Sequence, residues 1–152
     1  MTDRPFVSII IPCRNEERFI GLCLDSVLAN DYPLDRLEVL VVDGMSEDGT
    51  RRIVEDYALR SACIRLLDNP QKITPTALNI GIANATGQIV MRMDAHSRYP
   101  RNYVSGLITW QARTGADNVG GVRVKLPTND TCMAQAIAIG TYLSFWRWSG
   151  AV

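Results

Sequence analysis

Apolar residues along the chain alternate between short β-branched runs and longer stretches with helical spacing. The pattern predicts strands at Val7–Ile11, Glu38–Val42, Ile64–Leu67 and Gln88–Met93, and helices at Glu16–Leu28, Thr50–Leu59, Thr76–Ala85 and Asn102–Thr114. Pro12 is expected to stop the first strand, while Pro75 and Gly87 are typical of the start and the end of the third helix. This alternation indicates successive βαβ units.

The predicted strands are apolar at nearly every position and lack the polar-apolar alternation of a sheet with one wet face. Such strands are typical of a parallel sheet that is covered by helices on both faces. We therefore predict an α/β fold with a mostly parallel, Rossmann-like sheet. A chain of 152 residues that is 47% hydrophobic suits one domain, which we expect to span residues 1–152.

Charge and cysteine usage exclude several classes of function. Sixteen basic residues balance sixteen acidic ones, so no positive field favours nucleic acid, and we expect no nucleic-acid partner. The four cysteines have no CxxC spacing and accompany no secretory signal. We interpret them as reduced core residues of a cytoplasmic protein.

Polar clusters follow three of the predicted strands. They are Cys13–Glu17, Asp43–Gly49 and Asp94–His96, and in parallel sheets ligands bind at these carboxyl ends. Asp94 and His96, the only histidine, stand two residues apart where a buried strand gives way to a loop. A carboxylate and an imidazole in that position can both reach one divalent cation or the diphosphate that it holds. The pair predicts a metal-nucleotide site.

Each candidate also has a purely structural interpretation. Asp43 and Asp48 stand where helix-capping aspartates stand, and capping is the favoured role of Asp48. Asp94 with His96 can form a turn that caps the following segment. Asn79 can bond a neighbouring loop, and Lys72 and Arg92 either meet phosphate or lie solvated on the surface.

Four sequence motifs resemble those of family 2 glycosyltransferases with the GT-A fold. They are Ile11–Glu17, Val42–Thr50, Ala77–Gly81 and Met93–His96, in the family's order. The tract Arg92–Pro100 is most similar to enzymes of the succinoglycan-biosynthesis type, which build exopolysaccharide units on a lipid carrier. The resemblance implies an inverting glycosyltransferase that moves a sugar from a nucleotide-diphosphate sugar, a UDP-sugar being favoured, to a polysaccharide or lipid-linked acceptor.

The resemblance also assigns roles to individual residues. The nucleotide-sugar-binding positions are Pro12, Asn15, Glu16, Asp43, Asn79 and Asp94, with Asp43 matching the aspartate that holds the base or ribose. Asp94 matches the first carboxylate of the Asp-x-Asp motif, and His96 takes the place of the second. Since imidazole suits Mn²⁺ better than Mg²⁺, we expect Mn²⁺ to be the better activator.

The family's catalytic base and its Gln-x-x-Arg-Trp-type segment are expected beyond Val152, so the catalytic residue is unknown. We therefore expect a donor-binding portion of a longer enzyme, truncated at the acceptor side. The apolar segment 132–152 is interpreted as a buried helix or a membrane-surface segment, the first being favoured. The second would place the full-length protein at the inner face of the membrane.

Two other functions remain open. One is a non-catalytic nucleotide-binding fragment, which would describe this chain if the acceptor half is needed for transfer. The other is a sugar nucleotidyltransferase, a class in which a glycine-rich phosphate loop follows the first strand. The segment Pro12–Glu16 contains no glycine, which disfavours that class.

Overall fold

The computed structural model describes residues 4–121 of the chain. Its contacts divide the chain into two units, Met1–Ala116 and Asp117–Val152, and every element below belongs to the first. In chain order these are β1 (Val7–Cys13), α1 (Ile20–Leu28), the 3-10 turn η1 (Leu34–Arg36), β2 (Leu37–Asp43), α2 (Thr50–Arg60), β3 (Ile64–Asp68), α3 (Thr74–Asn84), β4 (Ile89–Arg92) and α4 (Tyr103–Thr114). All the predicted strands and helices are present, whereas η1 was not predicted. A single domain over the whole chain stays a prediction.

The four strands form one parallel sheet in the order β3-β2-β1-β4. In this register Cys13 pairs with Asp43, and Asp43 pairs with Asp68. The strands β1, β2 and β3 therefore end level with one another. The loops that follow them begin side by side on one rim of the sheet.

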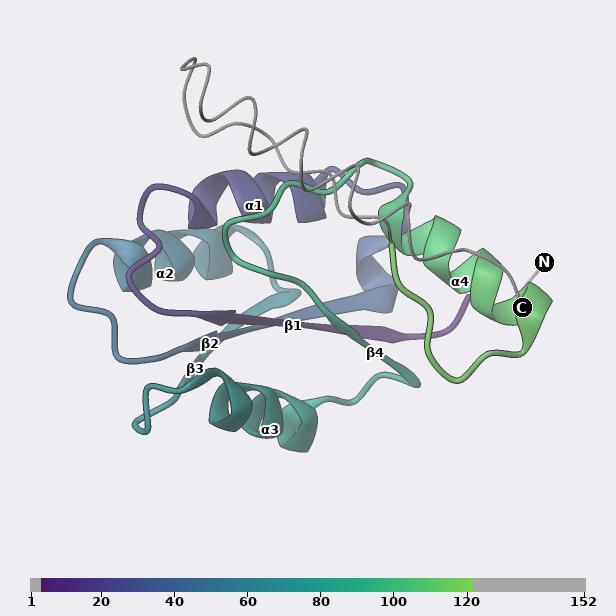
Figure 1. Ribbon diagram of the computed structural model, residues 1–152. Helices are drawn as coiled ribbons and strands as arrows, with labels where there is room; N and C mark the ends of the chain where they lie inside the picture. Colours follow the sequence, from purple (N-terminus) through teal and green to yellow (C-terminus); the bar gives the residue numbers. More distant parts are fainter. Residues whose placement is uncertain (1–3, 122–152) are drawn as a thin grey trace, which may run out of the picture. The chain divides into compact units, whose positions relative to one another are not determined.

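Helices cover both faces of the sheet: α1 and α2 lie on one face and α3 lies on the other (Figure 1). Successive strand residues point to opposite faces, so Ile9 and Ile11 belong to the larger core and Ile10 to the smaller one beneath α3. All three are at most 1% exposed. This two-sided burial explains the continuous apolar strands and confirms the predicted α/β class.

The prediction that Pro12 stops the first strand is wrong, because β1 continues to Cys13. The carbonyl oxygen of Cys13 accepts from the backbone nitrogen of Gly44, which directly follows β2. The carbonyl oxygen of Ile10 accepts from the backbone nitrogen of Met93, which directly follows β4. Pro12 therefore faces the β4 side, like Ile10, but lies beyond the last pair of that ladder, Ile10 with Arg92. A missing N–H at this point breaks no ladder hydrogen bond.

The first helix begins at Ile20, four residues later than predicted. The backbone nitrogens of Glu16 and Glu17 donate instead to Thr50 Oγ1 and Asp48 Oδ2, at 2.8 and 3.2 Å. These bonds hold the segment as a turn against the start of α2. Glu16 consequently stays in the loop at the sheet rim.

No helix within residues 4–121 is both long and apolar enough to cross a lipid bilayer. The segment 132–152, for which a buried helix or a membrane-surface segment was predicted, lies outside the described residues.

Candidate functional site

A pocket of about 210 Å³ opens at the carboxyl ends of the strands. Its lining includes Pro12 of β1 and residues from the loops after all four strands, among them Glu16, Gly44, Asn69, Asp94 and His96. Three cations, Arg14, Lys72 and Arg92, also line it. Carboxylates, an imidazole and cations thus meet in one concave site, as expected for a ligand that carries phosphate.

Four of the predicted site residues line this pocket: Pro12, Glu16, Asp94 and His96. The other three, Asn15, Asp43 and Asn79, are not among its lining residues. Asn79 is exposed on α3, Asn15 lies in the loop after β1, and Asp43 is the last residue of β2. Their direct contact with a nucleotide stays a prediction.

Asp94 and His96 each have a side-chain partner at the pocket. Asp94 Oδ1 accepts from Arg92 Nε at 3.1 Å and from Arg92 Nη2 at 3.0 Å, a charge-assisted pair. His96 Nδ1 lies 3.3 Å from Glu16 Oε1, so the imidazole is turned toward the loop after β1. The two predicted metal-binding side chains are therefore brought to one pocket from the loop after β4.

The donor set suits a cation that arrives with its ligand. Among residues 4–121 no three His, Cys, Asp or Glu side chains are grouped so as to hold a metal ion by themselves. Magnesium-like ions are commonly bound through one or two protein ligands, with substrate phosphates and water supplying the rest. Asp94 and His96, with Glu16 beside His96, fit that arrangement.

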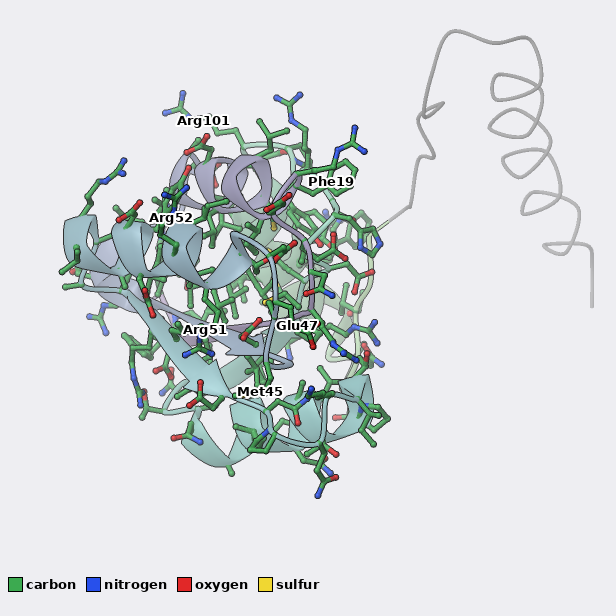
Figure 2. The ribbon with its side chains drawn as sticks, turned by 90° about the vertical axis from the view of Figure 1, so that its left-hand side faces the viewer. Phe19, Met45, Glu47, Arg51, Arg52 and Arg101 are labelled. Atoms are coloured by element: carbon green, nitrogen blue, oxygen red, sulfur yellow. The ribbon has the colours of Figure 1, made fainter. Side chains whose placement is uncertain are left out.

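Asp43 is fully buried at the end of β2, and its two carboxylate oxygens are already occupied. Ser46 donates to it from both its hydroxyl and its backbone nitrogen, the latter at 3.0 Å from Oδ2. Arg51 Nη1 donates to the same Oδ2 at 2.9 Å and to Asp68 Oδ1 at 2.8 Å. Figure 2 shows Arg51 close to the loop that carries Met45 and Glu47. Arg51 of α2 thus joins β2 and β3 through Asp43 and Asp68.

Left-handed backbone occurs once after each of the first three strands. Asn15, Met45 and Lys72 have φ angles of 54°, 54° and 61°. Such angles are uncommon outside glycine and often accompany functional sites. The Asn15 side chain also accepts from Glu47 N at 2.9 Å, which fixes the loop after β1 to the loop after β2. The rim is therefore shaped by three sharply turned loops.

Asp48 lies one residue before Gly49, the N-cap residue of α2, and accepts the N–H of the helix's first residue. Its Oδ1 accepts from Thr50 N at 3.0 Å at the start of α2, and its Oδ2 accepts from Glu17 N. Burial alone would raise the pKa of Asp48, but these bonds outweigh it and lower the pKa. The carboxylate therefore stays charged where the helix N-terminus favours an anion.

Cys13 and Cys23 are poor nucleophiles. Burial, followed by the charge of Asp43, raises the pKa of Cys13 far above its ordinary value. Burial, followed by the charge of Asp94, raises the pKa of Cys23 to about 12. Both thiols remain protonated near neutral pH, so neither supports nucleophilic chemistry. Cys63 also forms no disulfide bond among residues 4–121; Cys132 lies outside the described residues, so the reduced state of all four cysteines stays a prediction.

Three site residues were missed from the sequence. Asn69 directly follows β3 and lines the pocket, and the rule that selected the other strand ends would have selected it. Tyr99 fixes the backbone of Asp94, and Arg51 neutralises Asp43. No periodic pattern predicts the bonds of the last two, because each depends on how the loop between the residue and its partner folds.

Comparisons with known proteins identify the family of this chain. The family model "Glycosyl transferase family 2" matches residues 8–149. The chain is 36% identical over 113 residues to the succinoglycan biosynthesis protein ExoA of Rhizobium meliloti, covering 73% of this chain and 34% of that protein. It is 30% identical, over 93% of its own length and 47% of the relative's, to the dolichyl N-acetyl-alpha-D-glucosaminyl phosphate 3-beta-D-2,3-diacetamido-2,3-dideoxy-beta-D-glucuronosyltransferase of Methanococcus voltae.

Among solved structures, the fold is similar to the mannosyltransferase PcManGT from Pyrobaculum calidifontis, determined in complex with GDP-Man and Mn²⁺. The TM-score is 0.69 at 36% identity, over 73% of this chain and 33% of that one. The chain thus spans between a third and a half of the length of these relatives. From the family match together with this fold, the chain belongs to glycosyl transferase family 2 and has the GT-A fold predicted from its motifs.

Proposed function

We propose that this chain binds the sugar donor in an inverting glycosyltransferase, which moves a sugar from a nucleotide-diphosphate sugar to a polysaccharide or lipid-linked acceptor. The observation that carries the proposal is the pocket at the strand ends, which Glu16, Asp94 and His96 line together with Arg14, Lys72 and Arg92. A metal-bound diphosphate carries both the cation and the anion that these groups match.

Asp94 and His96 would hold a divalent cation, and Mn²⁺ is preferred in this proposal because one ligand is an imidazole. When bound, the cation would neutralise the negative charge that develops on the nucleotide-diphosphate leaving group. The similar PcManGT structure, which is a complex with GDP-Man and Mn²⁺, supports a cation of this kind.

The cations at the rim would assist the same leaving group. Arg92 pairs with Asp94 Oδ1, and Lys72 Nζ lies 3.8 Å from Glu47 Oε1. Both cations line the pocket, so either can exchange its carboxylate for a phosphate oxygen. None of residues 4–121 is proposed to remove the proton of the acceptor hydroxyl. The catalytic base stays an expectation.

The acceptor and its location belong to the same proposal. The relatives named for succinoglycan biosynthesis and for a dolichyl phosphate substrate support a saccharide or lipid-linked acceptor. Such a carrier would bring the reaction to the inner face of a membrane. A UDP-sugar is the favoured donor.

Calorimetric titration tests the donor site. UDP and GDP are titrated into the protein with Mn²⁺, with Mg²⁺ and with chelator, and then into Asp94→Asn and His96→Ala. We expect metal-dependent binding of at least one nucleotide, stronger with Mn²⁺, and its loss in both variants. Asp56→Asn is the matched control, because Asp56 is an exposed aspartate of α2 outside the pocket lining. Absence of binding under every condition would contradict the proposal.

A second candidate function is a nucleotide-binding module without sugar transfer. One observation favours it: the pocket carboxylates Glu16 and Asp94 already pair with His96 and Arg92. Neither carboxylate is therefore free to act as the base for an acceptor hydroxyl. Incubation with UDP-[³H]sugar and a lipid-phosphate or oligosaccharide acceptor separates the two. Labelled product indicates the transferase, and binding without product indicates the module.

A further inference from the structure

His96 is paired with a carboxylate from a different loop. Its Nδ1 lies 3.3 Å from Oε1 of Glu16, which is in the loop after β1, whereas His96 is in the loop after β4. A carboxylate only accepts hydrogen bonds, so Nδ1 must carry the hydrogen. A neutral imidazole has a single N–H, and its other nitrogen therefore keeps a lone pair. The pairing with Glu16 assigns that lone pair to Nε2.

Glu16 is the more firmly held member of this pair. Its backbone nitrogen donates to Thr50 Oγ1 at 2.8 Å, and its carbonyl oxygen accepts from the backbone nitrogens of Phe19 and Ile20 at 2.9 and 2.8 Å. The side chain of Glu16 is 22% exposed, whereas that of His96 is 57% exposed. The carboxylate thus belongs to a fixed turn, and the imidazole is the group that it orients.

The main chain that carries His96 is held by other contacts. The backbone nitrogen of Asp94 donates to the Tyr99 hydroxyl at 2.6 Å. Ala95, between the two predicted metal-binding residues, is 2% exposed and belongs to the larger core. These contacts fix the backbone, but they do not determine how the His96 ring is rotated about its side-chain bonds. Glu16 supplies the contact that fixes the ring.

We propose that Glu16 is a positioning residue for metal binding. It holds His96 with Nδ1 protonated, so that Nε2 is the nitrogen that meets the divalent cation of the donor. Histidines that bind metals commonly donate their other N–H to a carboxylate, which orients the ring and makes the binding nitrogen more basic. Both residues line the pocket with Asp94. This inference rests on the proposed function and deepens it, because Glu16 then acts through His96 and not by direct contact with the nucleotide.

The proposed preference for Mn²⁺ then depends on Glu16. Mg²⁺ is typically held by carboxylate, phosphate and water oxygens, so a nitrogen ligand favours Mn²⁺ over Mg²⁺. Without Glu16, the imidazole would rotate or adopt the opposite tautomer, in which Nε2 carries the hydrogen and cannot bind a cation. Asp94 would remain as an oxygen ligand for either ion. Loss of Glu16 should therefore weaken binding with Mn²⁺ and change binding with Mg²⁺ little.

Nuclear magnetic resonance tests the tautomer directly, because His96 is the only histidine of the chain. Long-range ¹H–¹⁵N correlation of the untagged, metal-free protein in mildly alkaline buffer reports which ring nitrogen carries the hydrogen. We expect Nδ1–H in the unaltered protein and a shift toward Nε2–H in Glu16→Leu. This substitution keeps the turn, because the turn is held through the backbone of Glu16. Nε2–H in the unaltered protein would overturn the inference.

Two measurements with the metal bound test the effect on the cation. UDP and GDP are titrated with Mn²⁺ and with Mg²⁺ into the unaltered protein and into Glu16→Leu. We expect the affinity with Mn²⁺ to fall about tenfold or more in the variant, while the affinity with Mg²⁺ changes little. Pulsed electron paramagnetic resonance of the Mn²⁺-nucleotide complex should show coupling to an imidazole nitrogen in the unaltered protein. That coupling should be lost in Glu16→Leu, as in His96→Ala.

Glu17→Leu is the matched control, because Glu17 is the neighbouring carboxylate of the same loop and is not among the pocket-lining residues. Glu17 Oε2 accepts from Gly49 N at 2.8 Å, so the control disturbs the loop but leaves the pair of Glu16 and His96 in place. It should keep the Nδ1–H tautomer, the nitrogen coupling and the Mn²⁺ preference. Equal losses in Glu17→Leu and Glu16→Leu would show an effect of loop structure and overturn the inference.

Each remaining outcome contradicts something specific. Equal weakening with Mn²⁺ and Mg²⁺ in Glu16→Leu would indicate direct contact between Glu16 and the nucleotide, and would overturn the inference. Nitrogen coupling that persists in Glu16→Leu would overturn it too. In both cases metal-dependent binding by the unaltered protein would leave the donor-binding function standing. If the unaltered protein binds neither nucleotide with either ion, the proposed function fails and the inference fails with it, whatever the tautomer of His96.

Discussion

The hydroxyl of Tyr99 lies 2.6 Å from the backbone nitrogen of Asp94 and accepts its N–H. The same hydroxyl lies 3.4 Å from the Asp94 carbonyl oxygen, to which Cys23 Sγ also donates at 3.6 Å. The Tyr99 ring packs against Tyr103, with 4.9 Å between ring centroids. The tyrosine therefore fixes the turn that presents Asp94 and His96 to the pocket.

Tyr99→Phe should weaken metal-dependent nucleotide binding. It removes the acceptor for the Asp94 N–H, which should cost about 1 kcal/mol, or roughly fivefold in Kd if all of it falls on binding. Burial raises the pKa of Tyr99 to about 12, so the hydroxyl stays protonated and the effect should not vary between pH 6 and 9. Calorimetry with UDP or GDP and Mn²⁺ at several pH values measures it.

Tyr57→Phe is the matched control for this variant. Burial raises the pKa of the Tyr57 hydroxyl to about 12 as well, and the hydroxyl donates to Asp25 Oδ1 at 2.6 Å, away from the pocket lining. In urea unfolding, Tyr57→Phe should lose about as much free energy of unfolding as Tyr99→Phe. Its Kd for the nucleotide should not change. Equal Kd values for the two variants would show that Tyr99 does not position Asp94.

Arg51→Met should destabilise the fold strongly, because it leaves the carboxylate of Asp43 buried without its cation. Removal of one partner of a buried pair costs about 3 kcal/mol. Asp68, followed by Asp43, raises the pKa of Arg51, as expected for a guanidinium shared by two carboxylates. Urea unfolding at neutral pH measures the loss.

A double variant tests the reason for that loss. Asp43→Asn combined with Arg51→Met removes the buried charge together with its partner, so it should be more stable than the sum of the two single changes implies. Arg52→Met, at an exposed position of α2 (Figure 2), should change stability by less than about 0.5 kcal/mol. Additive losses would indicate that Arg51 stabilises the fold in some other way.

Gly81→Ala and Gly106→Ala should change stability in opposite directions. A Cβ at Gly81 would lie 2.5 Å from Ile10 Cγ2, because α3 packs closely on the sheet there. Overpacking of this kind costs about 1–3 kcal/mol. Gly106, inside α4, has open space at the Cβ position, so alanine should stabilise by about 0.5–1 kcal/mol. Thermal unfolding of both variants checks the pair, and destabilisation by both would contradict the packing argument.

Acidification should reduce stability through Glu38, a buried carboxylate at the opposite end of the sheet. Burial alone would raise its pKa, but hydrogen bonds from Ser8 and from the backbone and hydroxyl of Thr86, with the charge of Arg65, lower the pKa below the ordinary 4.5. Since the folded state holds the proton less tightly, this stabilisation is complete above pH 4.5. It is lost as the pH falls through the lowered value.

Glu38→Gln tests that contribution. At pH 7 it should be less stable by about 1–3 kcal/mol, because charge-assisted bonds become neutral ones. Below pH 4.5 the difference from the unaltered protein should shrink. Urea unfolding across pH 3 to 7 gives both curves, and a constant difference between them would exclude Glu38 as the titrating group.

Much of the fold could be read from local patterns. Apolar runs such as Ile9 to Ile11 indicate strands that are buried on both faces, and the helical spacing after each run indicates the crossovers. The errors lie where one loop bonds another. Glu16 forms a turn and not a helical start because Thr50, 34 residues away, accepts its N–H. Pro12 remains in β1 because its neighbour β4 has already ended.

The sequence by itself determined the α/β class, the family motifs and the positions of Asp94 and His96 at a strand end, because these depend on periodicity and on neighbours in the chain. The tertiary structure alone decided which polar atoms are occupied. Arg51 and Ser46 fill the oxygens of Asp43, whereas Asn69 keeps an unpaired one beside the pocket. Such differences arise from contacts between segments that the register of β1, β2 and β3 brings together, and no local pattern encodes them.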